Sequence, residues 1–204
     1  MPQKHQICII HGGRTFRSQK DYQEFLEKHY ISLDYQPTWS VDYFDRILSD
    51  ECEIIRPKMP HFRNAKYENW KIYFEKYIAL LEDNVILMGI SLGGIFLAQY
   101  LAENKYPKNI KALYLVCPPF DDTMPHEDLC NGFKLPANSG YLTENCSNIK
   151  LLFSSDDPVI PVAHANKYKN WMPEALLHVF DDKNGHFMVE SFPEIIEMLQ
   201  EDLK

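Results

Sequence analysis

The sequence predicts an α/β fold in which a mostly parallel sheet lies between two layers of helices, a three-layer α/β/α sandwich. Short apolar runs typical of strands buried on both faces alternate with longer segments of helical periodicity. Glycines and polar residues follow directly after several of these runs, where the carboxyl ends of parallel strands form ligand sites. A chain of 204 residues is long enough for one such domain.

The first part of the chain supplies two strands and three helices. Residues 7–10 form a continuous apolar run that ends in a glycine pair, and residues 53–56 form a second run that prolines close. Residues 19–30, 40–48 and 65–82 carry apolar side chains at helical spacing, so we expect helices there. A strand followed by helices and another strand favours parallel pairing.

The rest of the chain continues the alternation. Four more apolar runs predict strands over residues 85–88, 110–117, 149–153 and 175–180. Helical periodicity places helices over residues 95–101, 162–171 and 190–203. We expect Pro193 to interrupt the last helix near its start, because proline lacks the N–H group that a helix interior needs.

Residues 118–148 differ from the rest because they hold four prolines and two glycines and show no sustained period. An irregular segment of this length is uncommon as a simple connection and predicts a short active-site cover. Its apolar side chains would line the site, namely Phe120, Met124, Phe133, Leu135 and Tyr141.

Composition argues against several classes of function. The formal net charge of −8 is unfavourable for nucleic-acid binding, which needs clustered lysines and arginines. No apolar run is long enough to cross a membrane, and the N-terminal residues lack the apolar core of a signal peptide. The five cysteines are odd in number and form no C-x-x-C pair, so we expect reduced thiols in a cytoplasmic protein. The sequence predicts no cofactor and no metal site.

Residues 89–94, GISLGG, carry the strongest signal of chemistry in the chain. They lie between a predicted strand and a predicted helix, the context in which G-x-S-x-G holds a nucleophilic serine on a sharp turn. Glycines flank Ser91 because a Cβ at either position would collide with neighbouring backbone. The free N–H groups at the start of the following helix would face an oxyanion. The alternative is an ordinary turn with a capping serine, and the rest of a triad would decide between the two.

His186 is the predicted base that a serine hydroxyl needs. It lies in DKNGHF after the last predicted strand, where Asn184 and Gly185 supply a tight turn. It is also the last histidine in the chain, which fits the order of serine, acid and histidine expected for this kind of site. Without the Ser91 turn, it would be interpreted as a surface-loop residue.

The carboxylate that orients the histidine should lie between these two residues in the sequence. Asp157 is the first choice, because SSDDPVIP follows a predicted strand and places this residue at the apex of a proline-fixed loop. Asp156, and either Asp121 or Asp122 after the preceding strand, remain alternatives. Any of these aspartates could instead be an ordinary turn residue.

Two backbone N–H groups should form an oxyanion hole. One belongs to Leu92, which follows the nucleophile. The other belongs to the loop after the first strand, where Gly13 is the first choice and Arg14 the second. His11 in the same loop is expected to brace it or else to contact the substrate. The predicted substrate pocket comprises His11, Arg14, Phe120 and Phe187.

With HGG, GISLGG, SSDDPVIP and NGHF after successive strands, the whole chain resembles an α/β-hydrolase. It is similar to small serine hydrolases without a large lid domain, the group of retinoblastoma-binding protein 9 and YdeN. Residues 56–60 (RPKMP) and the helix around Trp70 also resemble that group. The resemblance implies a triad of Ser91, Asp157 and His186.

The resemblance also implies a single domain over residues 1–204 with a sheet of about six strands. The chain departs from the group in two ways. Residues 14–50 are longer than the lean members need and carry an extra helix. The HGG run lacks the third glycine of HGGG-type esterases.

The predicted reaction is cleavage of an ester, thioester or amide through an acyl-enzyme, with His186 as base and then acid. A peptidase or acyltransferase would use the same residues, whereas a haloalkane dehalogenase would need aspartate in place of Ser91. An interaction module with a vestigial site is the alternative from another class. The short cover predicts an open, shallow pocket for a small acyl group, and residues 14–50 are where we expect a partner or a homodimer interface.

Overall fold

A computed structural model describes residues 4–204, so the first three residues of the predicted domain lie outside it. Six strands form one sheet in the order β2-β1-β3-β4-β5-β6, and all five pairings are parallel. The strands are β1 (His5–Ile10), β2 (Cys52–Ile55), β3 (Val85–Ile90), β4 (Ile110–Val116), β5 (Ile149–Ser154) and β6 (Leu176–Phe180). The predicted parallel sheet and α/β-hydrolase fold are confirmed.

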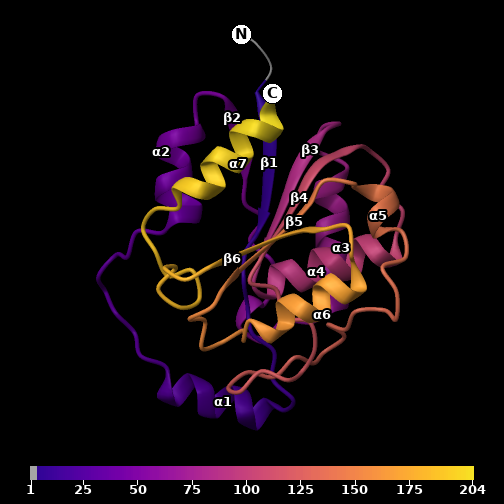
Figure 1. The fold of residues 1–204 in the computed structure, drawn as a ribbon. Coiled ribbons are helices and arrows are strands. Elements are labelled where there is room, and N and C mark those ends of the chain that lie inside the picture. The colour runs from indigo at the N-terminus through magenta and orange to yellow at the C-terminus, as the bar shows by residue number, and fades with distance from the viewer. Residues whose placement is uncertain (1–3) are drawn as a thin grey trace.

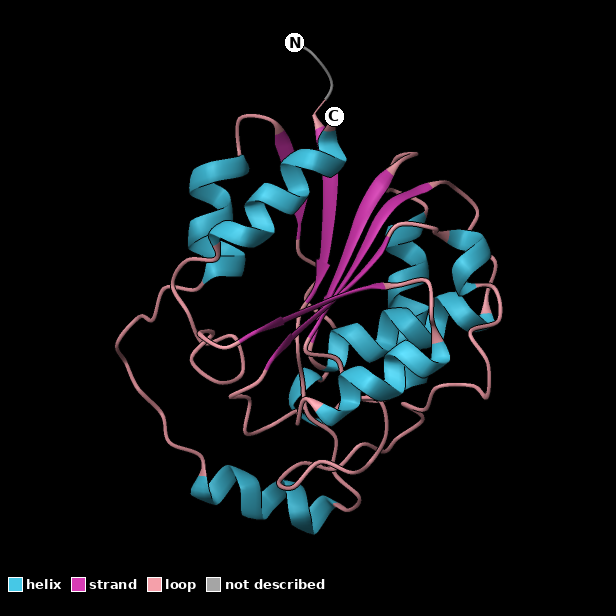
Figure 2. Ribbon diagram, viewed as in Figure 1, coloured by secondary structure: helices cyan, strands magenta, loops and turns pink. Residues whose placement is uncertain are grey.

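Helices cover both faces of the sheet (Figures 1 and 2). On one face lie α3 (Tyr67–Ile78), α4 (Leu92–Glu103) and α6 (Ala163–Trp171). The other face carries α2 (Phe44–Leu48) and α7 (Pro193–Leu203). Three shorter helices complete the fold: η1 (Trp39–Tyr43), η2 (Phe62–Asn64) and α5 (Leu142–Asn145). No helix in the described part of the chain is long and apolar enough to cross a membrane.

Each face of the sheet carries its own apolar core. Under α3 and α4, the ring of Phe96 lies with its centroid 5.5 Å from those of both Trp70 and Phe74. On the opposite face, Trp39 packs edge-on against Phe44 at 5.3 Å. Because rings of this size dominate the energy of burial, these two clusters fix where the helices sit on the sheet.

The helix α1 (Gln19–Lys28) belongs to neither layer. None of its residues is buried, and it lies away from the sheet at the end of a long connection (Figure 1). Its packing against the rest of the protein includes Phe16, whose ring lies 5.2 Å from that of Phe25 and 5.3 Å from that of Tyr22. The predicted helix over residues 19–30 therefore exists, but its apolar side chains do not enter a core.

Three predicted segments differ from the structure in detail. Pro193 begins α7 rather than interrupting a helix, because the first helical turn does not need its N–H group. The predicted helix over residues 40–48 starts as the π-helical turn η1 and continues as α2. Residues 118–148 are mostly irregular, as predicted, yet several of their side chains are buried in the core beside α3 and α4: Leu129, Phe133, Leu135, Leu142 and Cys146.

Candidate active site

Ser91 occupies the sharp turn between β3 and α4. Its φ and ψ of 53° and −121° are a conformation that side-chain-bearing residues rarely adopt. A Cβ on Gly93 would collide with the carbonyl oxygens of Ile10 and His11, and one on Gly89 would collide with the Gly93 carbonyl. Every residue of α4 except its last is buried, so the core holds this turn in place. The predicted role of the two glycines is therefore confirmed by the packing.

The imidazole of His186 is held by Asp157. Its Nδ1–H donates to Asp157 Oδ2 over 2.7 Å. The other carboxylate oxygen accepts the backbone N–H groups of Val159 at 2.8 Å and Ile160 at 2.9 Å. The Asp157 side chain is 1% exposed and that of His186 is 20% exposed. A carboxylate fixed by two backbone donors holds the ring in one tautomer, with Nε2 as its acceptor.

Asp156 holds the loop that carries His186 rather than the ring itself. Its carboxylate accepts the hydroxyl of Ser154 and, at 2.9 Å, the backbone N–H of Gly185. These hydrogen bonds keep the pKa of Asp156 below its usual value. Asp156 therefore stabilises the loop of His186, whereas its neighbour Asp157 contacts the imidazole.

The two aspartates after β4 lie elsewhere. Asp121 pairs with Lys167 at 2.7 Å, and Asp122 accepts the backbone N–H of Leu129 at 2.7 Å and pairs with Arg17. Neither contacts His186 in the described part of the chain. Of the four candidate acids, Asp157 is the one that the fold brings to the histidine.

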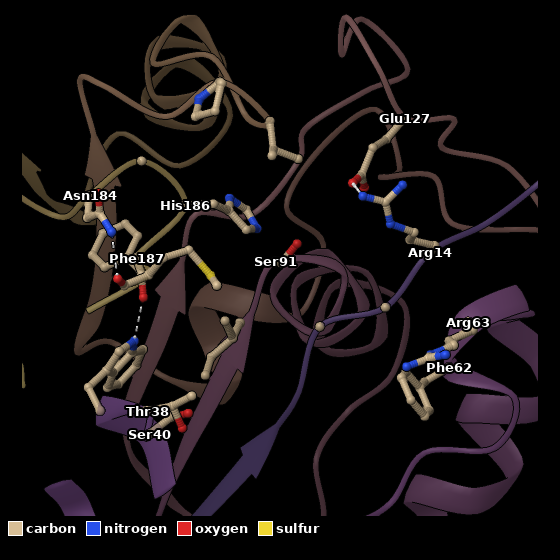
Figure 3. Close-up of a pocket in the computed structure, with 18 of the residues that line it drawn as sticks. Arg14, Thr38, Ser40, Phe62, Arg63, Ser91, Glu127, Asn184, His186 and Phe187 are labelled. Atoms are coloured by element: carbon tan, nitrogen blue, oxygen red, sulfur yellow. Dashed lines mark hydrogen bonds and ion pairs between the residues drawn. The ribbon is translucent and has the colours of Figure 1, made fainter. Parts of the chain in front are cut away.

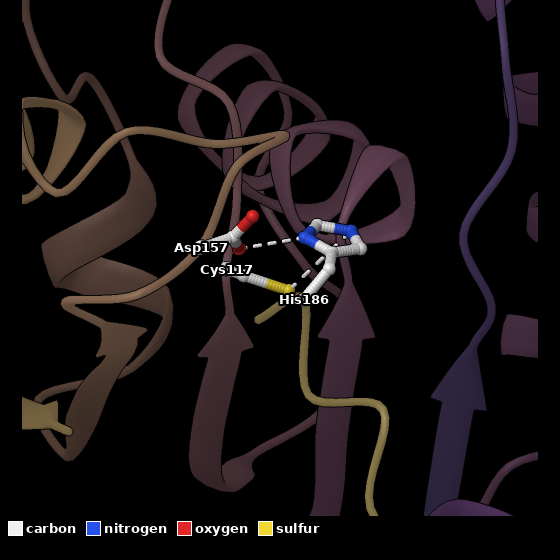
Figure 4. Close-up of side chains that lie close together, drawn as sticks. All are labelled: Cys117, Asp157 and His186. Atoms are coloured by element: carbon white, nitrogen blue, oxygen red, sulfur yellow. Dashed lines mark hydrogen bonds and ion pairs between the residues drawn. The ribbon is translucent and has the colours of Figure 1, made fainter. Parts of the chain in front are cut away.

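Cys117 lies close to the same imidazole, beside Asp157 (Figure 4). Its Sγ is 3.8 Å from His186 Nε2, and its side chain is fully buried at the end of β4. Burial of His186 disfavours the charged ring, but the surrounding groups outweigh this, and the Asp157 carboxylate raises the pKa of His186 above its usual value. Nothing in the sequence pattern indicates this contact, because Cys117 ends an apolar run like any other core thiol.

The side chains of Cys117, Asp157 and His186 could in principle hold a metal ion, since one ligand atom of each lies within 4.8 Å of the others. Both oxygens of Asp157 already accept hydrogen bonds, one of them from His186 itself. Only Sγ and Nε2 then remain to face a shared ion, fewer than the three protein ligands of a catalytic zinc site. The donor set fits hydrogen bonding better than metal coordination.

Two of the three candidate oxyanion donors are available. The N–H groups of Leu92 and Gly13 donate to no acceptor among residues 4–204. The N–H of Arg14 instead donates to the carbonyl of Phe62 at 2.8 Å, which removes the second choice. A Cβ on Gly12 would lie 3.2 Å from the Cβ of Ser91, so this loop passes directly beside the serine.

His11 braces that loop and does not line the cavity at Ser91. Its Nε2 accepts the backbone N–H of Met59 at 3.0 Å, and its Nδ1 donates to the Gly12 carbonyl at 2.6 Å. The ring also packs edge-on against Trp70. Both ring nitrogens of His11 are therefore occupied, so His11 braces the loop, the first of its two expected roles. It does not line the cavity, and its predicted place in the substrate pocket is wrong.

Ser91 and His186 open into a cavity of about 580 Å³ (Figure 3). Residues 14–50 contribute a large part of its wall: Arg14, Phe25, His29, Thr38, Trp39 and Ser40. From the described residues 118–148, only Glu127 lines it. Phe120 instead packs on Tyr168 at 5.1 Å and lines a separate cavity, so the predicted placement of Phe120 is wrong. A volume in this range suits a small-molecule site.

The predicted pocket residue Phe187 lies in the wall, and Trp39 connects it to residues 14–50. The indole Nε1–H of Trp39 donates to the Phe187 carbonyl at 3.1 Å, and the Trp39 backbone N–H donates to Val189 at 3.2 Å. Arg14, also predicted, pairs with Glu127 at 2.6 Å, and its guanidinium lies over the ring of Phe25. Sequence reasoning missed Trp39, although a tryptophan just before a predicted helix was an available signal.

The comparisons with known proteins identify the family and the fold. A family model described as serine hydrolase matches residues 37–201, which include Ser91, Asp157 and His186. No curated protein matches the sequence.

Among solved structures, the ydeN gene product from B. subtilis is 20% identical over 98% of each chain, with a TM-score of 0.69. A YdeN-like hydrolase from Pectobacterium atrosepticum is 15% identical over 97% of this chain and 91% of its own, with a TM-score of 0.64. The esterase EaEST from Exiguobacterium antarcticum is 14% identical over 100% of this chain and 93% of its own, with a TM-score of 0.60. At these identities the likeness shows the fold.

Proposed function

The chain belongs to the serine hydrolase family, and we propose that it hydrolyses carboxylic esters through an acyl-enzyme on Ser91. The observation that carries this proposal is the 2.7 Å contact between His186 Nδ1 and Asp157 Oδ2, beside a serine on a strained turn. The name of the Exiguobacterium relative, an esterase, supports the same class of reaction. Thioesters and amides would react through the same groups and are the nearest alternatives.

In the proposed mechanism, Ser91 attacks the carbonyl carbon while His186 Nε2 takes its proton. Asp157 stabilises the imidazolium, which then protonates the leaving group, and water releases the acid by the reverse sequence. The unoccupied N–H groups of Leu92 and Gly13 would hold the oxyanion. Loss of one such donor typically slows turnover by about 10²- to 10³-fold.

The cavity favours substrates with an apolar group next to the ester. Its wall includes the rings of Phe25, Trp39 and Phe187, and the mouth carries the Arg14–Glu127 ion pair, which neutralises both charges. Burying an apolar chain against such rings stabilises the complex by about 25 cal/mol for each Å² removed from water. We therefore replace the expected small acyl group with an apolar group of intermediate size.

A fluorophosphonate probe tests the nucleophile. We expect stoichiometric labelling of the wild-type protein, none of Ser91→Ala, and labelling slowed by about 10⁴-fold in Asp157→Asn. Asp122→Asn is the matched control and should label at the wild-type rate. Labelling that survives Ser91→Ala would eliminate the proposed site.

A series of p-nitrophenyl esters from acetate to decanoate tests the substrate. We expect kcat/KM to rise from acetate to chains of intermediate length, because each added methylene gains about 0.8 kcal/mol on burial. A maximum at acetate would instead support the small acyl group.

A further inference from the structure

Cys117 contacts the one atom of His186 that the proposed mechanism needs to be free. Nε2 must accept the proton of Ser91, yet the Cys117 thiol lies 3.8 Å from it, within reach of an S–H hydrogen bond. The hydroxyl of Ser91 makes no hydrogen bond with any residue from 4 to 204. Among the hydrogen bonds of the described residues, the thiol is therefore the partner of the acceptor nitrogen.

Two further observations separate Cys117 from an ordinary core thiol. Its φ of 41° lies in the left-handed region, which residues with a Cβ adopt at a cost and which concentrates at functional sites. It is also fully buried, whereas Ser91 and His186 line the cavity. Cys117 therefore cannot meet a substrate, and its effect on the reaction must pass through His186.

We propose that Cys117 is a positioning residue that holds Nε2 of His186 in the substrate-free enzyme and yields it to Ser91 when substrate binds. This inference rests on the proposed role of His186 as the base. The thiol and the serine hydroxyl compete for one lone pair, so the strength of the thiol contact sets how much of the enzyme is ready to react.

The other charged groups around the imidazole stay constant when Cys117 is changed. Asp157 accepts Nδ1–H from the loop after β5, and Asp156 in the same loop holds Gly185 next to the ring. From residues 118–148, Glu127 interacts electrostatically with His186. A change in the titration of His186 on replacing Cys117 can thus be assigned to the thiol.

The first experiment follows the His186 ring by NMR during a pH titration, with its signals assigned through His186→Gln. We expect the pKa of His186 to rise in Cys117→Ala, because an S–H group that donates to Nε2 stabilises the neutral ring, and to stay at the wild-type value in Cys8→Ala. Cys8 is a matched control, being fully buried in β1 and without contact to the site. An unchanged titration in Cys117→Ala would overturn the proposal.

The second experiment measures the rate of inactivation by the fluorophosphonate probe at high pH, where the base is neutral. Cys117→Ala should react about two- to fivefold faster than wild type, the gain expected from removing a weak competing hydrogen bond. Cys117→Ser, whose shorter side chain places oxygen farther from Nε2, should behave alike and serves if the alanine variant does not fold. A slower rate in both variants, at a melting temperature equal to that of Cys8→Ala, contradicts the proposal.

The two proposals fail separately. If wild-type protein does not react with the probe, the esterase proposal fails, while the NMR titration still measures the contact between Cys117 and His186. If the probe reacts and Cys117→Ala changes neither rate nor titration, only the role of Cys117 is lost.

Discussion

Residues 118–148 and residues 14–50 are both long connections between strands, but the protein holds them in different ways. The first segment places Phe133 and Leu142 in the core under α3 and α4. The second carries α1, which buries none of its residues, and leaves Leu33 and Tyr30 exposed to solvent. The length of a connection therefore does not decide which segment covers the cavity. Residues 14–50 enter the core only at their end, through Trp39, Phe44 and Leu48, whereas α1 stays outside it and contributes Phe25 to the wall of the cavity at Ser91.

Replacing one phenylalanine from each segment should give the largest contrast. Phe133 is 2% exposed and packs on Trp70, so Phe133→Ala should lower the free energy of unfolding by about 3–5 kcal/mol. Phe25 lies at the cavity wall without entering a core, so Phe25→Ala should cost less than about 1 kcal/mol of stability and raise KM for apolar esters. Urea unfolding and ester kinetics on both variants provide the test. Equal losses of stability would mean that α1 is bound to the body as firmly as residues 118–148.

Replacing one tryptophan in contact with each segment should give a second contrast, with a smaller loss of stability. Trp39 and Trp171 each donate an indole hydrogen bond to a backbone carbonyl, Trp39 to Phe187 beside the base and Trp171 to Pro136 in the other segment. Trp39→Phe and Trp171→Phe should each cost about 1–3 kcal/mol of stability, because the carbonyl loses its partner. Only Trp39→Phe should also lower kcat, since it loosens the loop that carries His186. A similar fall in kcat for both variants would refute a specific link between residues 14–50 and the loop that carries His186.

The pH dependence of kcat/KM should show the smallest effect. The base must be neutral to accept a proton, and the pKa of His186 is raised, so kcat/KM should fall with decreasing pH through a midpoint above the usual value of about 6.5. Glu127, which residues 118–148 contribute to the cavity, favours the charged imidazole. Glu127→Gln should therefore move this midpoint to lower pH by a fraction of a unit, and Glu144→Gln, on α5, should leave it unchanged. A midpoint that moves to higher pH in Glu127→Gln would contradict this assignment.

The sequence was sufficient for those parts of the site that local chemistry determines. Glycine at 89 is required by a collision with Gly93 in the same turn, and Asp157 lies in a loop where a proline directly follows it. Each of these features depends on residues that are close in the chain, so a pattern of residue types reveals it. The order of the strands then brings Ser91 and His186 to the same edge of the sheet.

The sequence was insufficient where distant segments meet. Phe120 and Trp39 are both aromatic residues beside irregular backbone, and nothing local shows that the first turns towards α6 while the second reaches the loop of His186. The N–H of Arg14 is lost as an oxyanion donor because Phe62, far along the chain, accepts it. The contact of Cys117 with the base likewise joins two loops that only the folded sheet brings together.

The absence of buried residues in α1 also bears on how this protein can change over generations or in the laboratory. Substitutions that leave the core intact are usually nearly neutral for stability, so this helix can exchange many of its side chains without loss of folding. Those same exchanges alter the cavity lining at Phe25. Selectivity for the ester can therefore change through substitutions in α1, which is separate from the sheet that carries the nucleophile. Libraries of variants confined to residues 19–28 are a suitable way to search for new substrates.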